Sequence, residues 1–204
     1  MNLKVFPTDK AQIYLLFYKP TSSDPFQNRL VSFFDGPFCH VEMAFPERVG
    51  EELWEKEVWG SSIYQGETVF FKQKSYKRDG YVSFGIEVNV SQMHKIRSYC
   101  RQQTESKIPF CIKSMYAAYL PFQVMNTEAT FCSKHVASAL QYGGIYNNIG
   151  LNPALTTPSK LYRLLNSHSP ILQVVPSRMV PENANACSAK MVKDIVNKSR
   201  YLGV

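Results

Sequence analysis

The sequence has no long hydrophobic run, and this absence limits the classes of protein to which it can belong. No apolar segment approaches the roughly 20 residues that a transmembrane helix needs. The opening segment, MNLKVFPTDKAQ, has neither the apolar core nor the small-residue cleavage site of a secretory signal. We therefore expect an intracellular, cytoplasmic protein without a membrane-spanning helix.

Cysteine is scarce, and its spacing follows no disulfide or zinc pattern. The 5 cysteines are odd in number and irregularly spaced, and neither a CxxC nor an HxxxH motif occurs. Without an export signal we expect reduced thiols, so that one of them is free to act as a nucleophile. Cys39, His40, Cys132 and His135 are the ligand types of structural zinc, but they lack its spacing. We expect no metal site and no other cofactor.

Charge is moderate and slightly one-sided. The chain has 23 basic and 16 acidic residues, a net charge of +7, and the basic residues are scattered. This excess favours anionic partners such as a membrane surface, but it predicts no specific nucleic-acid site. With 45% hydrophobic and 19% charged residues, the chain has enough apolar material for a sizeable core.

Short apolar runs in the first half predict five strands. They span residues 11–19, 38–45, 58–64, 68–74 and 81–90. The polar segment 21–37, which separates the first two runs, contains Pro25, Gly36 and Pro37. We expect it to be a loop with about one helical turn.

The second half changes to a helical period. Helices are predicted over residues 91–106, 111–120, 132–142 and 156–167, followed by a late strand over 171–176. Ser91 is the expected cap of the first helix, and Thr157, followed by Pro158, that of the last. The pattern indicates one α+β domain over residues 1–177, with an antiparallel sheet packed against helices. The basic segment 178–204 is expected to be a helical extension.

Cys132 stands at a position that suits a nucleophile. The polar segment NTEAT precedes it and a good helix-forming segment follows, so its sulfur should lie in the first turn of a helix. Unpaired N–H groups there favour the thiolate, which is the attacking species. A free cysteine is, however, more often a small buried hydrophobe.

A nucleophilic cysteine needs a base, and four histidines are available. His135 follows Cys132 by one helical turn, so its ring should not point across the sulfur. His94 is expected on a helix surface and His168 in a polar turn. His40 alone lies on a strand among apolar neighbours, where it is either the base that meets Cys132 or, as is more common for a lone strand histidine, a satisfied core or edge residue.

Three motifs in order carry a family resemblance: GPFCHVEMAF, TFCSKHVASALQYGGI and LTTPSKLYRLL. Together they resemble the circularly permuted papain-like group of the NlpC-type cysteine hydrolases. This group occurs in bacteria, phages and large DNA viruses, and lecithin retinol acyltransferase-like enzymes are relatives. In it a strand with a histidine precedes a helix that opens with Phe-Cys-Ser, and a Thr/Ser-Pro-x-x-Leu-Tyr helix follows. The resemblance covers roughly residues 11–176 and implies a permuted papain-like fold.

The resemblance assigns the nucleophile to Cys132 and the general base to His40. The third polar residue, which orients the imidazole, usually comes from the following strand, where Ser61 and Ser62 stand. Glu42 is the alternative that we rank first, because residues 40 and 42 of one strand share a face. The chain departs from the family after Cys-Ser, where Lys134 and His135 take the places of an acidic residue and a large apolar one.

The expected function is that of a thiol hydrolase or acyltransferase, such as a cysteine peptidase, amidase or lipid esterase. His40 takes the thiol proton, and Cys132 attacks a carbonyl to form a thioester acyl-enzyme. The substrate is a peptide, another amide or an acyl lipid. The alternative is an inactive papain-like fold that serves as a binding or virion-associated module of a viral protein.

Overall fold

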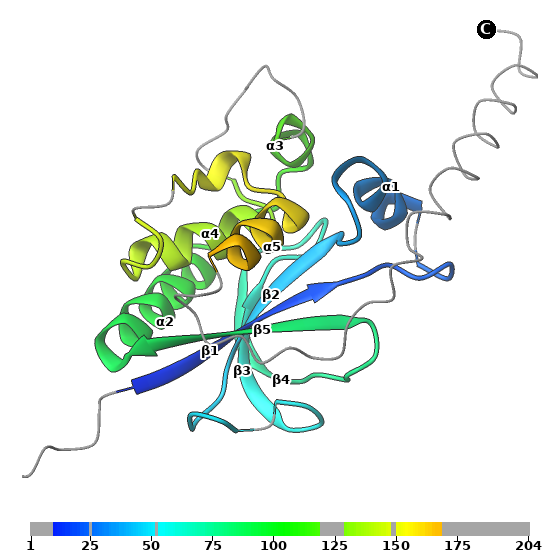
Figure 1. Ribbon diagram of the computed structural model, residues 1–204. Coiled ribbons are helices and arrows are strands. Elements are labelled where there is room, and N and C mark those ends of the chain that lie inside the picture. The colour runs from blue at the N-terminus through cyan, green and yellow to red at the C-terminus, as the bar shows by residue number, and fades with distance from the viewer. Residues whose placement is uncertain (1–9, 25, 52, 119–128, 148–149, 169–204) are drawn as a thin grey trace, which may run out of the picture.

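One antiparallel sheet of five strands organises the part of the chain that the structure describes (Figure 1). The computed structural model describes residues 10–24, 26–51, 53–118, 129–147 and 150–168. The strands are β1 (Lys10–Tyr18), β2 (His40–Phe45), β3 (Glu57–Ser62), β4 (Phe70–Ser75) and β5 (Tyr81–Asn89). Their order across the sheet is β4-β3-β2-β1-β5. The five predicted strands and the mixed α and β architecture are therefore confirmed.

β2 lies in the middle of the sheet and sends side chains to both faces. Val41, Met43 and Phe45 belong to the main hydrophobic core. Because successive strand residues point to opposite faces, Glu42 and Ala44 lie on the other face. There Ala44 packs in a second, smaller apolar cluster. The strand therefore carries an acidic side chain into the interior on the face away from the main core.

Two helices cover the main-core face of the sheet, α2 (Val90–Glu105) and α4 (Cys132–Tyr142) (Figure 1). The predicted cap of α2, Ser91, was wrong. The helix begins earlier, because Asn89 and Gln92 form a capping box: each side chain accepts a hydrogen bond from the backbone N–H of the other.

Residues 26–35 form a regular helix, α1 (Phe26–Asp35), where the sequence indicated a loop with about one helical turn. The prediction was wrong because Pro25 and Gly36 flank the segment instead of interrupting it, and the residues between them include neither proline nor glycine. On its inner side Val31 is 5% exposed and packs in an apolar cluster with Met115.

The last described helix, α5 (Pro158–Ser167), holds the segment that leads into β2. Thr157 caps it, as predicted. Asp35, the final residue of α1, accepts hydrogen bonds from the Thr157 hydroxyl at 2.5 Å and from the Ser159 N–H at 2.8 Å. The Ser159 hydroxyl in turn accepts the N–H of Phe38 at 3.2 Å. The Thr-Pro-Ser motif therefore positions the beginning of β2.

Two short helices complete the described elements, α3 (Ile112–Ala117) and the 3-10 helix η1 (Pro153–Leu155). The predicted strand over 171–176 and the extension over 178–204 lie outside the described residues. Among the helices that are described, none combines the length and the apolar character that crossing a membrane requires.

Candidate active site

Cys132 is the first residue of α4, as the sequence predicted. Phe131 precedes it with an extended backbone, and the Phe131 carbonyl accepts the N–H of His135 as the first hydrogen bond of the helix. The N–H groups of the first turn have no carbonyl partner inside a helix and favour negative charge near the sulfur. Cys132 is 4% exposed and lines a cavity.

The cavity in front of Cys132 has a volume of about 360 Å³ and also contains His40 in its wall. The fold thus brings together Cys132 and His40, the two residues that the resemblance pairs. Apolar lining comes from Val31, Ile63, Phe110 and Met115, and polar lining from Tyr18, Asp24, Asn28, Tyr64, Gln65 and Tyr81. A substrate with both an apolar and a polar part suits such a cavity.

His40 is the first residue of β2, and its side chain is 14% exposed. Burial by itself lowers the pKa of an imidazole. Here the negative charge and hydrogen bond of Cys132, together with those of Glu42, outweigh burial and raise the pKa of His40 to about 9. The imidazolium is therefore the favoured form at neutral pH, and it stands beside the sulfur, where it stabilises a thiolate.

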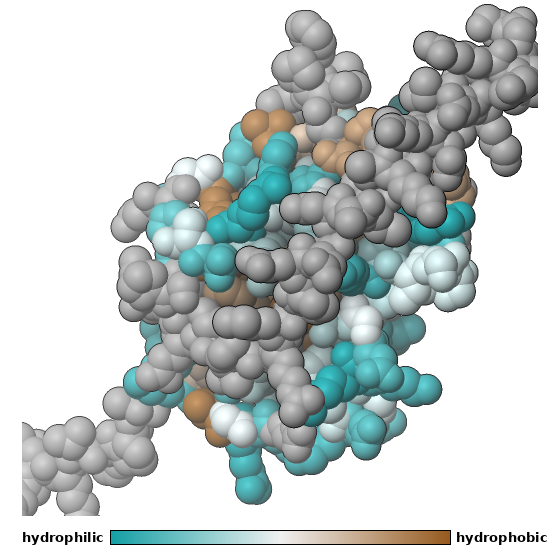
Figure 2. Space-filling model, turned by 45° about the vertical axis from the view of Figure 1, so that its right-hand side comes forward, coloured by the Kyte–Doolittle hydropathy of each residue, from teal (hydrophilic) through white to brown (hydrophobic). Residues whose placement is uncertain are grey.

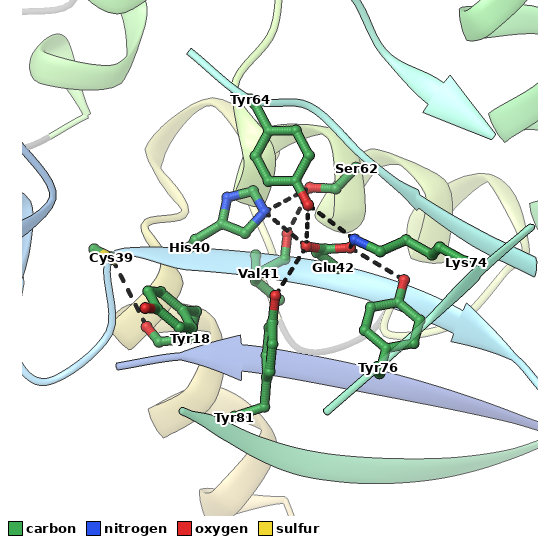
Figure 3. Close-up of polar contacts among 10 residues, drawn as sticks. All are labelled: Tyr18, Cys39, His40, Val41, Glu42, Ser62, Tyr64, Lys74, Tyr76 and Tyr81. Atoms are coloured by element: carbon green, nitrogen blue, oxygen red, sulfur yellow. Dashed lines mark hydrogen bonds and ion pairs between the residues drawn. The ribbon is translucent and has the colours of Figure 1, made fainter. Parts of the chain in front are cut away.

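The orientation of the His40 ring is set by its neighbours (Figure 3). Its Nε2 lies 3.4 Å from Glu42 Oε1 and 3.5 Å from the Ser62 hydroxyl. The Tyr64 ring stacks on the imidazole, with centroids 5.0 Å apart and an interplanar angle of 20°. Because Nε2 faces the carboxylate, Nδ1 points away from it (Figure 3).

Glu42 is a fully buried carboxylate that accepts hydrogen bonds from four side chains in addition to its contact with His40 (Figure 3). Oε1 accepts from the hydroxyls of Tyr64 at 2.7 Å and Tyr81 at 3.3 Å. Oε2 accepts from Lys74 Nζ at 2.8 Å and from the Tyr76 hydroxyl at 3.1 Å. These four donors, which we call the carboxylate cage, replace the water that the carboxylate loses on burial.

The cage and His40 keep Glu42 ionised. Burial alone raises the pKa of a carboxyl group, but the hydrogen bonds and positive charges of His40 and Lys74 outweigh it and hold the pKa of Glu42 well below its usual range. Burial and the nearby carboxylate raise the pKa of each cage tyrosine, so the three hydroxyls remain neutral donors. A permanent negative charge behind the ring therefore favours the protonated form of His40.

Of the three candidates for the third polar residue, Glu42 makes the charged contact with His40. Ser62 lies beside the ring, but its hydroxyl donates to a backbone carbonyl at 2.7 Å. Ser61 is on the other side of β3, where its hydroxyl lies 2.9 Å from His135 Nε2. The structure therefore places Glu42 and Ser62 next to His40, and Ser61 apart from it.

His135 has a structural environment and takes no part in the cavity. It is fully buried, and burial lowers its pKa to about 3, so the ring is neutral. Because the Ser61 hydroxyl donates to a backbone carbonyl at 2.8 Å, it accepts from His135 Nε2–H. His94 is exposed on α2 and His168 follows α5, so His40 is the histidine that lines the cavity.

Two other cysteines lie near the site and differ in character. Cys39 lines the cavity, but burial and the charges of Cys132 and Asp24 raise its pKa to about 12, so it stays protonated. Cys111 precedes α3, and its sulfur accepts hydrogen bonds from the N–H and the hydroxyl of Ser114. These bonds outweigh burial and lower the pKa of Cys111.

Sequence reasoning did not find the carboxylate cage. A partial signal was present, because Ser62 and Tyr64 are two residues apart, as are Lys74 and Tyr76, and each spacing places two side chains on one face of a strand. Which face meets Glu42 depends on the pairing of β2 with β3 and of β3 with β4, and this pairing is a property of the folded sheet.

Comparisons with protein-family models, with curated proteins and with solved structures found no match to this chain. Within the described residues, no group of three or more His, Cys, Asp or Glu side chains is arranged to hold a metal ion.

Proposed function

We propose that the protein is a cysteine hydrolase or acyltransferase that acts on an amide or ester. Cys132 is the nucleophile, His40 the general base, and Glu42 the positioning residue that orients His40 and favours its charged form. The observation that carries this proposal is that Cys132 and His40 line one cavity, with a buried carboxylate behind the imidazole ring. Catalytic cysteines use this order of groups.

We also propose that the fold is of the circularly permuted papain-like type. The histidine strand, β2, precedes the cysteine helix, α4, in the chain, and the helix packs against this strand in the sheet. The capped helix α5 follows and holds the entry to β2. This is the order of elements that the three sequence motifs imply.

The reaction proceeds in two steps. The Cys132 thiolate attacks the carbonyl carbon, a C–S bond forms, and the oxygen takes up negative charge near the N–H groups of the first turn of α4. The C–N or C–O bond then breaks, and His40 gives its proton to the leaving amine or alcohol. Water or another acceptor attacks the thioester, its proton returns to His40, and the C–S bond breaks to release the acyl product and the thiolate.

The test is the rate at which iodoacetamide alkylates each cysteine as a function of pH, resolved by mass spectrometry. We expect Cys132 to react fastest below about pH 7, and the His40→Ala variant to slow it by about tenfold or more. His94→Ala, which changes an exposed histidine, is the matched control and should leave the rate unchanged.

The other cysteines serve as internal references. Cys100 is fully buried, and its rate reports opening of the fold. Cys111, which has its own hydrogen-bond donors, should react at a rate that does not depend on His40. If Cys132 reacts as slowly as Cys100, or if His40→Ala leaves its rate unchanged, the enzyme proposal is wrong and an inactive binding module is the better description.

A further inference from the structure

The outer side of α1 exposes an unusual number of aromatic residues. Phe26, Phe33 and Phe34 are 54%, 39% and 63% exposed, whereas Val31 on the inner side is 5% exposed. Phe26 and Phe33 are seven residues apart and therefore share one face of the helix, with Phe34 adjoining it. The helix is thus apolar on two sides, of which only the inner one is covered by described residues.

A second helix at this end of the molecule, α3, also exposes an apolar side chain. Val31 of α1 and Met115 of α3 belong to one apolar cluster, so the two helices pack on the same part of the interior. On the exposed side of α3, Ile112 is 39% exposed. Figure 2 shows hydrophobic residues (brown) at the upper end of the molecule, the end at which Figure 1 places α1 and α3. We call Phe26, Phe33, Phe34 and Ile112 the aromatic face.

The helices around the aromatic face carry more positive than negative charge, and Asp24, which lines the cavity, lies two residues before Phe26. The helices α1, α3 and α5 contain four basic residues: Arg29, Lys113, Lys160 and Arg163. Lys160 lies at the end of α3, because its Nζ donates to the Ala118 carbonyl at 3.2 Å. The three helices contain one acidic residue, Asp35, which is 7% exposed and is bonded to the start of α5.

The aromatic face adjoins the cavity of the candidate active site. The same two helices that expose the aromatic face provide Asn28, Val31 and Met115 to the cavity wall. The cavity therefore lies against the inner side of the two helices whose outer side carries the aromatic face.

We propose that the aromatic face docks on an anionic membrane surface and that the substrate is an acyl lipid drawn from it. Exposed aromatic and aliphatic side chains bordered by lysine and arginine suit the boundary between headgroups and acyl chains. A protein partner would also bury the aromatic side chains, but the excess of positive charge on the three helices matches the charge of anionic headgroups. The assignment of the substrate rests on the proposed thiol chemistry, whereas the docking surface does not.

The test is cosedimentation of the full chain with vesicles of equal parts phosphatidylcholine and phosphatidylserine. We expect wild type to bind these vesicles, to bind phosphatidylcholine alone weakly, and to be released by salt. The double variant Phe33→Ser/Phe34→Ser should lose about tenfold or more in affinity, because it removes two anchors. Lys113→Glu should lose about fivefold or more.

Matched controls separate this surface from general stickiness. Tyr142→Ser removes an aromatic residue that is 55% exposed on α4, and Lys95→Glu reverses an exposed charge on α2. Both should bind like wild type. An unchanged alkylation rate of Cys132 in the double phenylalanine variant shows that the fold and the active site are intact, so that the docking proposal and the proposed function fail or stand separately.

Three outcomes would overturn the docking proposal. In the first, wild type binds vesicles of neither composition. In the second, the double variant binds vesicles as tightly as wild type. In the third, wild type self-associates in solution and the double variant is monomeric with no change in vesicle binding, which assigns the aromatic face to a second copy of the chain.

Discussion

Replacing Glu42 by glutamine should both destabilise the fold and slow the alkylation of the Cys132 thiol. Glutamine keeps the size of the side chain but removes the charge, and its amide group presents two hydrogens. One side of the carboxylate faces Lys74 and Tyr76, and the other faces Tyr64 and His40. Either orientation of the amide therefore sets its hydrogens against donors, and two cations lose their counter-ion.

The magnitude follows from the burial of the group. Removing one partner of a buried ion pair costs about 3–5 kcal/mol. The Lys74 side chain is 20% exposed and regains some hydration, so we expect the lower end, about 3 kcal/mol. For a chain of this length that loss lowers Tm by roughly 6–12 °C. The free energy of unfolding in urea is the primary measurement.

The same variant should slow alkylation of Cys132. The charge and hydrogen bond of Glu42 contribute to the raised pKa of His40, which is about 9, so their loss moves this pKa down toward its ordinary range. Less imidazolium then stands beside the sulfur at neutral pH. We expect the alkylation rate near pH 7 to fall by about threefold to tenfold.

A surface ion pair provides the matched control. Glu87 pairs with Lys10 at 2.5 Å, but the two side chains are 32% and 50% exposed. Glu87→Gln should therefore cost less than about 1 kcal/mol. The double variant Glu42→Gln/Lys74→Met should lose less unfolding free energy than the sum of the losses in the two single variants, because no lysine is then left without a counter-ion. A loss below about 0.5 kcal/mol for Glu42→Gln would refute the reasoning.

Three further predictions concern the surroundings of the site. Because the pKa of His135 is lowered to about 3 in the folded chain, the unfolded chain binds more protons than the folded chain below about pH 6.5. The free energy of unfolding should therefore fall with decreasing pH by up to about 1.4 kcal/mol per pH unit. Urea unfolding of His135→Gln should show a shallower fall. Gly60→Ala should cost about 1–3 kcal/mol in urea unfolding, because its Cβ would lie 2.2 Å from the Tyr76 hydroxyl. Asp35→Asn should cost about 1–3 kcal/mol and slow Cys132 alkylation, because it loosens the start of α5.

Each of these has a result that contradicts it. An equal pH dependence in wild type and His135→Gln would show that this ring does not govern acid stability. Adding Tyr76→Phe to Gly60→Ala should restore part of the lost stability. If it restores none, the Tyr76 hydroxyl is not the atom that the new Cβ meets. If Asp35→Asn has the unfolding free energy and the Cys132 alkylation rate of wild type, the contact between Asp35 and α5 does not position β2.

The local elements could be predicted because their causes lie within a few residues. The five strands follow from short apolar runs, and the start of α5 follows from Thr157 and Pro158. The position of Cys132 at a helix start has the same local origin. The helix α1 was missed because Pro25 and Gly36 flank it. The cap of α2 was predicted at Ser91, two residues after the observed cap, Asn89.

The candidate site was predictable only in part. His40 and Cys132 could be paired from motif order, and Glu42 could be placed beside His40 because alternation along one strand is a local rule. The cage could not be predicted, because Tyr64, Lys74 and Tyr76 reach Glu42 from segments whose pairing with β2 depends on the whole sheet.

By itself, the sequence determined the strands, the capped helices and the chemical identity of a thiol and an imidazole. The tertiary structure alone decided that Glu42 is buried among four donors, that Ser61 belongs to His135, and that α1 and α3 expose an apolar face beside the cavity. The physical reason is the range of the interactions. Periodicity and capping act over a few residues, whereas burial and ion pairing join side chains that only the folded sheet brings together.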